Sequence, residues 1–81
     1  MKAKRSLTLH GHRTSVALEP VFWEVLDDVA ARDSRSLAGL VQEIDDGRTS
    51  GPVTSGLASH LRVWCVRELR RRLRDTPSSG G

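Results

Sequence analysis

The stretch that decides the fold is residues 13–23, which read RTSVALEPVFW. Residues 13–18 can be divided with a period of two into a more apolar and a more polar set, and this period is typical of a β-strand with one buried face. Pro20 follows almost at once, and its fixed backbone angle suits the first turn of a helix. The pattern therefore predicts a short strand that leads straight into a helix.

The predicted strand has two different faces, because alternate residues point to opposite sides. The face that is predicted to be buried carries Thr14, Val16 and Leu18. The opposite face carries Arg13, Ser15 and Ala17. The side chains of this second face are small, polar or basic, so the face is expected to contact solvent or a polar partner.

Apolar residues recur at helical spacing in three later segments. The first helix is expected to run to about Arg32, with Phe22 and Leu26 on its apolar side. The second has Ser36 as an N-cap and an apolar stripe of Leu37, Leu40, Val41 and Ile44. The third is a long helix over residues 55–75, capped by Thr54 or Ser55.

The order of elements over residues 13–46 resembles the ribbon-helix-helix family, the Arc and MetJ type of repressor. The resemblance is carried by residues 13–18, by FWEVL at residues 22–26 and by RSL at residues 35–37. GHRTS at residues 11–15, together with Phe22 and Trp23, resembles a bacterial subgroup with a further helix after the core. The implied fold is mainly α with one short N-terminal β-strand, and it forms an intertwined dimer around a two-stranded antiparallel ribbon.

Composition and the positions of Gly and Pro divide the chain into five predicted parts. They are a basic N-terminal arm or strand extension (1–12), a ribbon-helix-helix core (13–46), a connection (47–54), a C-terminal helix (55–75) and a disordered tail (76–81). The two parts without regular structure are rich in Gly, Pro, Ser and Thr.

A homodimer is expected because a single copy leaves a strand edge and apolar stripes without partners. A single core of an 81-residue chain also gives only marginal stability. No internal disulfide can add to it, because Cys65 is the lone cysteine. The residues predicted to form the dimer core are Thr14, Val16, Leu18, Phe22, Leu26, Leu37, Leu40, Val41 and Ile44.

The exposed ribbon face has two interpretations. Arg13 can donate two hydrogen bonds to guanine, Ser15 can bond to several bases, and Ala17 can touch a thymine methyl group. The face is equally a plain solvent face on the residues alone, and the resemblance favours the reading of bases in the major groove of DNA.

Phosphate contacts are predicted at two places. The resemblance puts Ser34, Arg35 and Ser36 at a helix N-terminus that clamps a phosphate. The basic arm adds Lys2, Lys4 and Arg5, which would reach a polyanion first.

Charge is segregated along the chain although the net charge is only +3. Residues 1–18 hold four basic residues and no acid, residues 19–46 hold eight acids against two arginines, and residues 47–81 hold seven arginines against two acids. A polyanion would therefore meet the ends of the chain first. The arginines of the last helix either reach DNA phosphates, complement the negative helix end, or face an acidic partner such as the first helix of the dimer mate.

The residues give no sign of catalysis, of a cofactor or of a metal site. There is no catalytic order of Ser, His and Asp and no glycine-rich phosphate loop, and His10 and His12 alone are a weak metal motif. The absence of an apolar leader or of a long apolar run predicts a cytoplasmic protein outside the membrane. The expected function is a transcriptional regulator. The alternative is a protein-interaction module of antitoxin or adaptor type, in which the ribbon serves only dimerisation and the last helix holds a protein partner.

Overall fold

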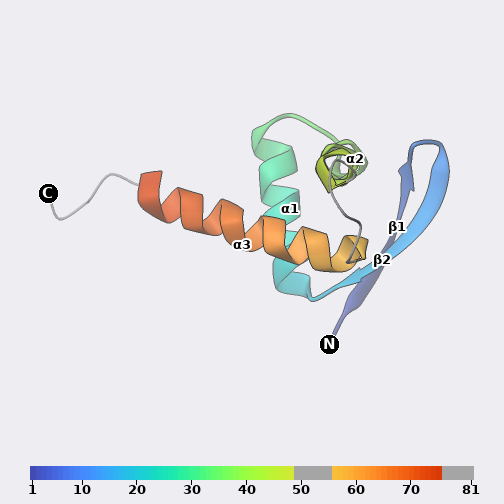
Figure 1. Ribbon diagram of the computed structural model, residues 1–81, viewed down its shortest axis with the longest axis horizontal. Coiled ribbons are helices and arrows are strands. Elements are labelled where there is room, and N and C mark those ends of the chain that lie inside the picture. The colour runs from blue at the N-terminus through green and yellow to red at the C-terminus, as the bar shows by residue number, and fades with distance from the viewer. Residues whose placement is uncertain (49–55, 76–81) are drawn as a thin grey trace, which may run out of the picture.

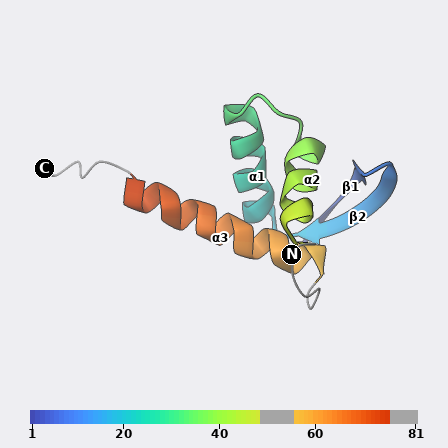
Figure 2. The same ribbon diagram turned by 45° about the horizontal axis from the view of Figure 1, so that its top comes forward.

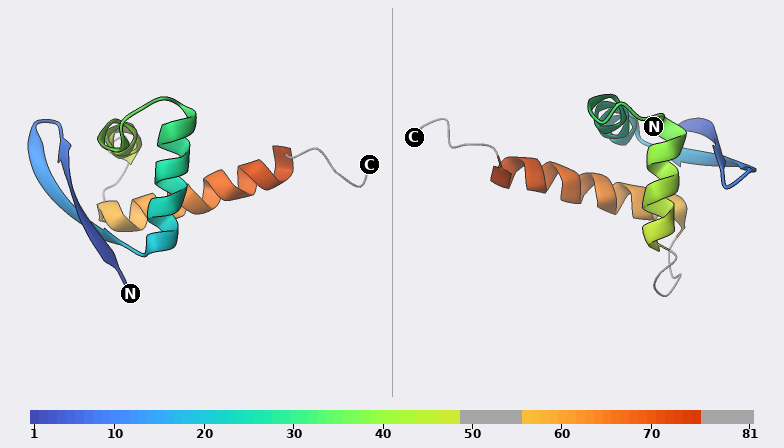
Figure 3. Two further views of the ribbon diagram at one scale, coloured as in Figure 1. Left: turned by 180° about the vertical axis from the view of Figure 1, so that it is seen from behind. Right: turned by 90° about the horizontal axis from the view of Figure 1, so that it is seen from above.

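The computed structural model describes residues 1–48 and 56–75, and it shows a β-hairpin followed by three helices (Figure 1). The strands are β1 (Ala3–Leu9) and β2 (His12–Leu18), and the helices are α1 (Pro20–Arg32), α2 (Leu37–Arg48) and α3 (Leu57–Asp75). Helices α1 and α2 stand side by side, and α3 crosses them so that its C-terminal half projects from the body (Figures 2 and 3). The expected mainly α fold, with strand structure at the N-terminus and an additional C-terminal helix, is confirmed.

The hairpin differs from the expected single strand. Strand β2 pairs antiparallel with β1 of the same chain, from Ala3 opposite Leu18 to Leu9 opposite His12. The two residues between the strands, His10 and Gly11, have φ values of 52° and 80°. Two successive positive φ values give a turn whose twist matches that of the strands, so the chain can reverse within two residues. The segment expected as an arm or strand extension is therefore mostly a strand.

The turn between α1 and α2 satisfies the last carbonyl groups of α1. Ser34 has a φ of 54°, the left-handed conformation that this position favours. Its N–H donates to the carbonyl oxygen of Ala31 at 3.2 Å, and the N–H of Arg35 donates to that of Ala30 at 2.8 Å. These two hydrogen bonds end α1 and direct the chain into α2.

The core of the described part is closed within one chain. Six of the residues predicted for the core are buried, namely Val16, Leu18, Leu26, Leu40, Val41 and Ile44. Three are half-buried, namely Thr14, Phe22 and Leu37. The core also holds Leu7, Leu9, Trp23, Val25, Val29, Ala30, Leu61 and Cys65, so the hairpin and α3 both contribute to it. The structure contains one chain, and the intertwined dimer therefore stays a prediction.

The boundaries of the last two helices fall close to the expected ones. Helix α2 continues to Arg48, two residues into the segment expected as a connection. Helix α3 begins at Leu57, where the N–H of His60 donates to the carbonyl oxygen of Gly56 at 3.1 Å. The predicted caps Thr54 and Ser55 and the predicted tail at residues 76–81 lie outside the described residues.

Candidate nucleic-acid interface

The hairpin outer face is the side of the β-hairpin that points away from the helices. Its cross-strand pairs are Lys4 with Ala17, Ser6 with Ser15, and Thr8 with Arg13. All of these residues are exposed except Ala17, which is half-buried. The three predicted base-contacting residues thus share one face with a lysine and two further hydroxyl side chains. No acidic residue lies on this face.

The hairpin is fixed by its inner face, where Leu7, Leu9, Val16 and Leu18 are buried against the helices. The indole Nε1 of Trp23 donates to the carbonyl oxygen of Ala3 at 2.7 Å and so ties the start of β1 to α1. Such a hydrogen bond satisfies the polar end of a buried tryptophan. The outer face is therefore presented by a ribbon that is anchored along its whole length.

The tip of the hairpin is tied to α2. The backbone N–H of His10 donates to the side-chain oxygen Oε1 of Gln42 at 3.0 Å. The ring nitrogen Nε2 of His10 lies 2.9 Å from Oδ1 of Asp46. These contacts hold the turn beside the C-terminal half of α2, and they leave the strand residues of the outer face free.

Arg5 does not lie on the hairpin outer face. Its guanidinium nitrogens donate to both carboxylate oxygens of Asp27 at 3.0 and 3.2 Å, and its guanidinium carbon lies 4.8 Å from the ring centre of Trp23. Arg5 shares the inner face with Leu7, so its charge is directed to α1. Among the predicted phosphate-contacting residues of the arm, Lys4 lies on the outer face and Lys2 is exposed just before β1.

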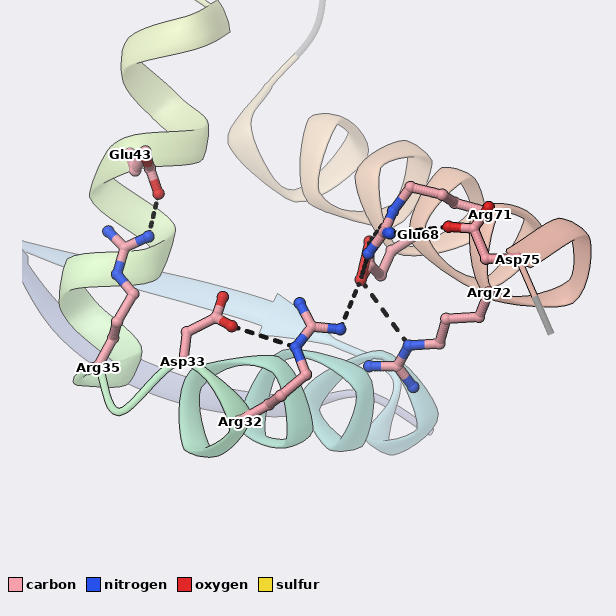
Figure 4. A network of polar contacts seen from close by, with 8 residues as sticks. All are labelled: Arg32, Asp33, Arg35, Glu43, Glu68, Arg71, Arg72 and Asp75. Atoms are coloured by element: carbon pink, nitrogen blue, oxygen red, sulfur yellow. Dashed lines mark hydrogen bonds and ion pairs between the residues drawn. The ribbon is translucent and has the colours of Figure 1, made fainter. Parts of the chain in front are cut away.

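The predicted phosphate clamp lies at the other end of α1 from the hairpin. Ser36 caps α2, because its side-chain oxygen accepts a hydrogen bond from the N–H of Gly39 at 3.0 Å. The guanidinium of Arg35 pairs with Glu43 and donates to the carbonyl oxygen of Gly39 at 3.1 Å (Figure 4). Ser34 is exposed in the turn. Arg35 must therefore leave its internal partners before it can contact a phosphate.

A buried carboxylate joins α3 to the end of α1. Glu68 is 7% exposed and accepts hydrogen bonds from Arg32 at 3.2 Å and from Arg71 at 2.6 to 3.1 Å (Figure 4). The Arg71 hydrogen bond, and secondarily Arg32, lower the pKa of Glu68 although burial opposes them. Burial also raises the pKa of the neighbouring Cys65 thiol to about 11. This cluster is structural, since it secures the helix that closes the core under the hairpin.

A second ion pair fixes the junction between β2 and α1. The Nε of Arg62 on α3 donates to Oε1 of Glu19 at 2.9 Å, and this hydrogen bond lowers the pKa of Glu19. Glu19 is the residue between the end of β2 and the start of α1. The ion pair therefore holds the ribbon at a set angle to the helices.

Sequence reasoning misses the contribution of β1 to the outer face, namely Ser6 and Thr8. The alternation of residues 6–10 is visible in the sequence, but Gly11 after it suggests a bulge or bend and not a turn. A two-residue turn at His10-Gly11 places Ser6 beside Ser15 by register alone.

Two features are absent from the part of the chain that the structure describes. No group of three or more His, Cys, Asp or Glu side chains is placed there to hold a metal ion. No described helix has the length and apolar character needed to cross a membrane.

Residues 2–69 match the family model described as a ribbon-helix-helix domain. The fold is similar to the solved structure of an uncharacterized protein from Bordetella pertussis Tohama I, with a TM-score of 0.80 and 34% sequence identity. That match covers 98% of this chain and 64% of the other, so this chain spans less than two thirds of the length of that protein. No curated protein matches this sequence.

Proposed function

Because the chain belongs to the ribbon-helix-helix family, we propose that it is a DNA-binding protein that reads base sequence with its hairpin outer face and regulates transcription. Proteins of this family are typically regulators without enzymatic activity, and they typically bind DNA as dimers. The proposal includes a bacterial, cytoplasmic setting without a cofactor, as expected for such a regulator.

The observation that carries the proposal is the composition and position of the hairpin outer face. A two-stranded ribbon has the width of the major groove of B-DNA. Lys4, Arg13 and four small residues cover this ribbon without an acid, and its inner face is anchored in the core. Positive charge and hydroxyl groups on a rigid support suit a polyanion that carries hydrogen-bonding base edges.

The proposed roles follow from the chemistry of each side chain. Arg13 has no partner among the described residues and can donate two hydrogen bonds to O6 and N7 of a guanine. Ser15 can bond to several bases, Ala17 can only touch a thymine methyl group, and Ser6 and Thr8 extend this row on β1. Sequence preference is therefore expected to rest mainly on Arg13.

The phosphate contacts are proposed at Lys4 on the ribbon, at Lys2 just before it and at the start of α2. Free N–H groups at a helix N-terminus attract an anion, and Ser34, Arg35 and Ser36 surround that point. Arg35 would exchange Glu43 for a phosphate oxygen on binding. Lysines and helix termini of this kind fix the register of a protein on DNA without reading its sequence.

The proposal also includes a homodimer. The described sheet has two strands, so β1 and β2 each keep one edge without a strand neighbour. Exposed strand edges favour pairing with another chain, and an antiparallel pair of identical edges is related by a two-fold axis. Sedimentation at low micromolar concentration should show a dimer, with a thermal midpoint that rises with protein concentration. A concentration-independent monomer would contradict this part of the proposal.

The test of base reading compares three arginine variants on two DNAs. One DNA is a sequence that the protein selects from a random pool, and the other is unselected. Arg13→Ala should cost about 1–3 kcal/mol on the selected DNA and much less on the unselected one. Arg35→Ala should weaken both alike and lower the salt dependence by about one unit for each phosphate that is no longer bound. Arg5→Ala is the matched control, because it removes the same charge from the inner face of the same hairpin.

The binding titrations are run by fluorescence anisotropy across a salt series. Equal small effects of Arg13→Ala and Arg5→Ala on both DNAs would mean that the ribbon does not read bases. An absence of binding to any DNA at low salt would end the proposal and favour the second candidate function.

That second candidate is a protein-interaction module of antitoxin or adaptor type. The observation in its favour is the outer side of α3, where Val63, Val66 and Leu73 remain exposed. Exposed apolar side chains in a row suit a protein partner better than a nucleic acid. In this case the ribbon would serve only dimerisation.

A further inference from the structure

The α3 outer face consists of Val63, Val66, Arg67, Arg70, Leu73 and Arg74. Its apolar side chains are well exposed, with 48% of Val63, 47% of Val66 and 77% of Leu73 accessible to solvent. Helical spacing places these residues on the side opposite to the buried Leu61 and Cys65. The C-terminal part of this face lies on the half of α3 that projects from the body (Figures 1 and 2).

The arginines of this face differ from the other arginines of α3. Arg62 pairs with Glu19, and Arg71 pairs with Glu68 and Asp75. In the described part of the chain, Arg67, Arg70 and Arg74 have no such partner and they line a shallow pocket together with Arg71. The face is thus apolar and positively charged, with no acid on it.

Helix α1 has an outer face of the opposite charge. It carries Val21, which is 56% exposed, and the exposed acids Glu24 and Asp28 one and two turns further on. No described residue pairs with Glu24 or Asp28, whereas the neighbouring Asp27 is held by Arg5. We call Val21, Glu24 and Asp28 the α1 outer face.

We propose that the α3 outer face is a docking surface for the α1 outer face of a second copy of this chain. The spacing agrees, because Arg70 and Arg74 are four residues apart, as are Glu24 and Asp28. Residues four apart are neighbours on a helix surface, so two ion pairs can form side by side. Val21 would then cover the exposed Val63 or Val66 beside them.

The same observations argue against DNA as the occupant. A phosphate backbone would satisfy the three arginines, but it would leave Val63 and Val66 in water. A second copy supplies acids and an apolar side chain together. Two copies that each offer both faces can make the contact twice about a two-fold axis.

Part of the α3 outer face lies beyond the family match. The matched region ends at residue 69, whereas Arg70, Leu73 and Arg74 follow it. The contact is also separate from the proposed base reading, because none of its residues lies on the hairpin. Failure of the base reading therefore leaves this contact standing, and the disulfide test below distinguishes the contact from pairing through the strand edges.

The first test is charge reversal and rescue. Arg70→Glu with Arg74→Glu should weaken self-association at least about tenfold in sedimentation equilibrium, because like charges then face each other. Adding Glu24→Arg and Asp28→Arg to the same chain should restore most of the affinity. Arg13→Glu, an equal reversal on the hairpin outer face, should leave self-association unchanged. A weakening that the acid reversals do not rescue would overturn the proposal, and so would a loss of DNA binding without any change in self-association.

The second test does not depend on how tight the association is. A tagged chain with Glu24→Cys is mixed in turn with untagged chains carrying Arg67→Cys, Arg70→Cys or Arg74→Cys, and is oxidised mildly. At least one mixture should give a mixed disulfide dimer on a non-reducing gel. The native Cys65 is buried, with its pKa raised to about 11, so it should not compete. The control replaces Glu24→Cys by Glu43→Cys, an exposed acid on α2. Mixed dimers no more abundant than in this control would overturn the proposal.

Discussion

The hairpin and α3 both have an apolar inner face and a basic outer face. They differ in the uncharged side chains that surround the basic residues on the outer face. Each packs an apolar inner face into the core, and each shows solvent an outer face with basic residues and no acid. On the hairpin, Arg13 stands among hydroxyl groups such as Ser15. On α3, Arg70 stands among exposed valines and a leucine. Equal charges therefore suit different partners: hydroxyl neighbours favour base edges and phosphates, and apolar neighbours favour another protein surface.

The largest expected loss of stability comes from a substitution on the inner face of the hairpin. Val16 is 3% exposed, so Val16→Asp places a carboxylate in the core and should cost more than about 4 kcal/mol, enough to unfold the protein. Ser15→Asp adds the same group one residue earlier, on the outer face, and should leave the fold intact. Circular dichroism during thermal unfolding distinguishes them. Equal losses of stability would mean that the two faces are not different in burial.

The same comparison on α3 is expected to give a smaller effect. Leu61 is fully buried, and Leu61→Ala should lower the free energy of unfolding by about 2–5 kcal/mol, because it removes packed atoms and leaves a cavity. Leu73→Ala, the same change on the α3 outer face, should lie within about 0.5 kcal/mol of the parent. Urea unfolding measures both. A large effect of Leu73→Ala at low protein concentration would show that the outer face is covered within one chain.

The third prediction concerns Glu68, because its buried carboxylate makes the ionic contact on the inner side of α3. At neutral pH, Glu68→Gln should cost about 1–3 kcal/mol through weaker hydrogen bonds to Arg71 and Arg32. The pKa of Glu68 is lowered from its ordinary 4.5, so its stabilising effect is present above that pH and disappears as the pH falls through the lowered value.

The parent protein should therefore lose more stability on acidification below about pH 4.5 than Glu68→Gln does. Urea midpoints at pH 7 and at several acidic values provide the measurement. The pair Glu19 and Arg62 acts in the same direction in both proteins, so the difference between them isolates Glu68. Parallel pH profiles would exclude a stabilising role of the Glu68 charge.

The smallest expected effect compares two arginines on opposite faces of the hairpin. Arg5→Ala should cost about 1 kcal/mol of stability, because it removes the ion pair with Asp27 and the stacking over Trp23. Arg13→Ala should leave stability almost unchanged and should act on DNA binding instead. Chemical unfolding of both variants in parallel tests this division. A larger loss of stability for Arg13→Ala would place that side chain in the fold and not in the interface.

Much of the fold can be predicted from the sequence because it depends on periodicity. The two faces of residues 13–18, the helix from Pro20 to Arg32 and the stripe of α2 all follow from spacing. The hairpin does not follow, because it depends on the conformation of two residues, and His10-Gly11 is not one of the pairs, such as Asn-Gly, that indicate a two-residue turn.

The roles of two charged residues can be found by the same spacing rules. Arg5 has the same parity as Leu7 and Leu9, which places it on the inner face of β1. Glu68 follows Leu61 and Cys65 at helical steps, which places it on the apolar side of α3. Composition alone assigns Arg5 to a phosphate contact, because it counts Arg5 with the basic arm. Its partner Asp27 lies 22 residues away, and such a pairing needs the three-dimensional structure.

The His10-Gly11 turn has a consequence for the order in which the chain folds. The hairpin joins residues at most 15 positions apart, from Ala3 to Leu18, whereas the Arg32 and Glu68 contact spans 36 positions. Short loops close at a smaller entropic cost, and hairpins of this kind form within about 1–10 μs. We therefore expect the ribbon to pair early, while the helices are still assembling. A growing chain could cover one edge of β2 before α3 has been synthesised, which would shorten the time during which that edge can capture a wrong partner.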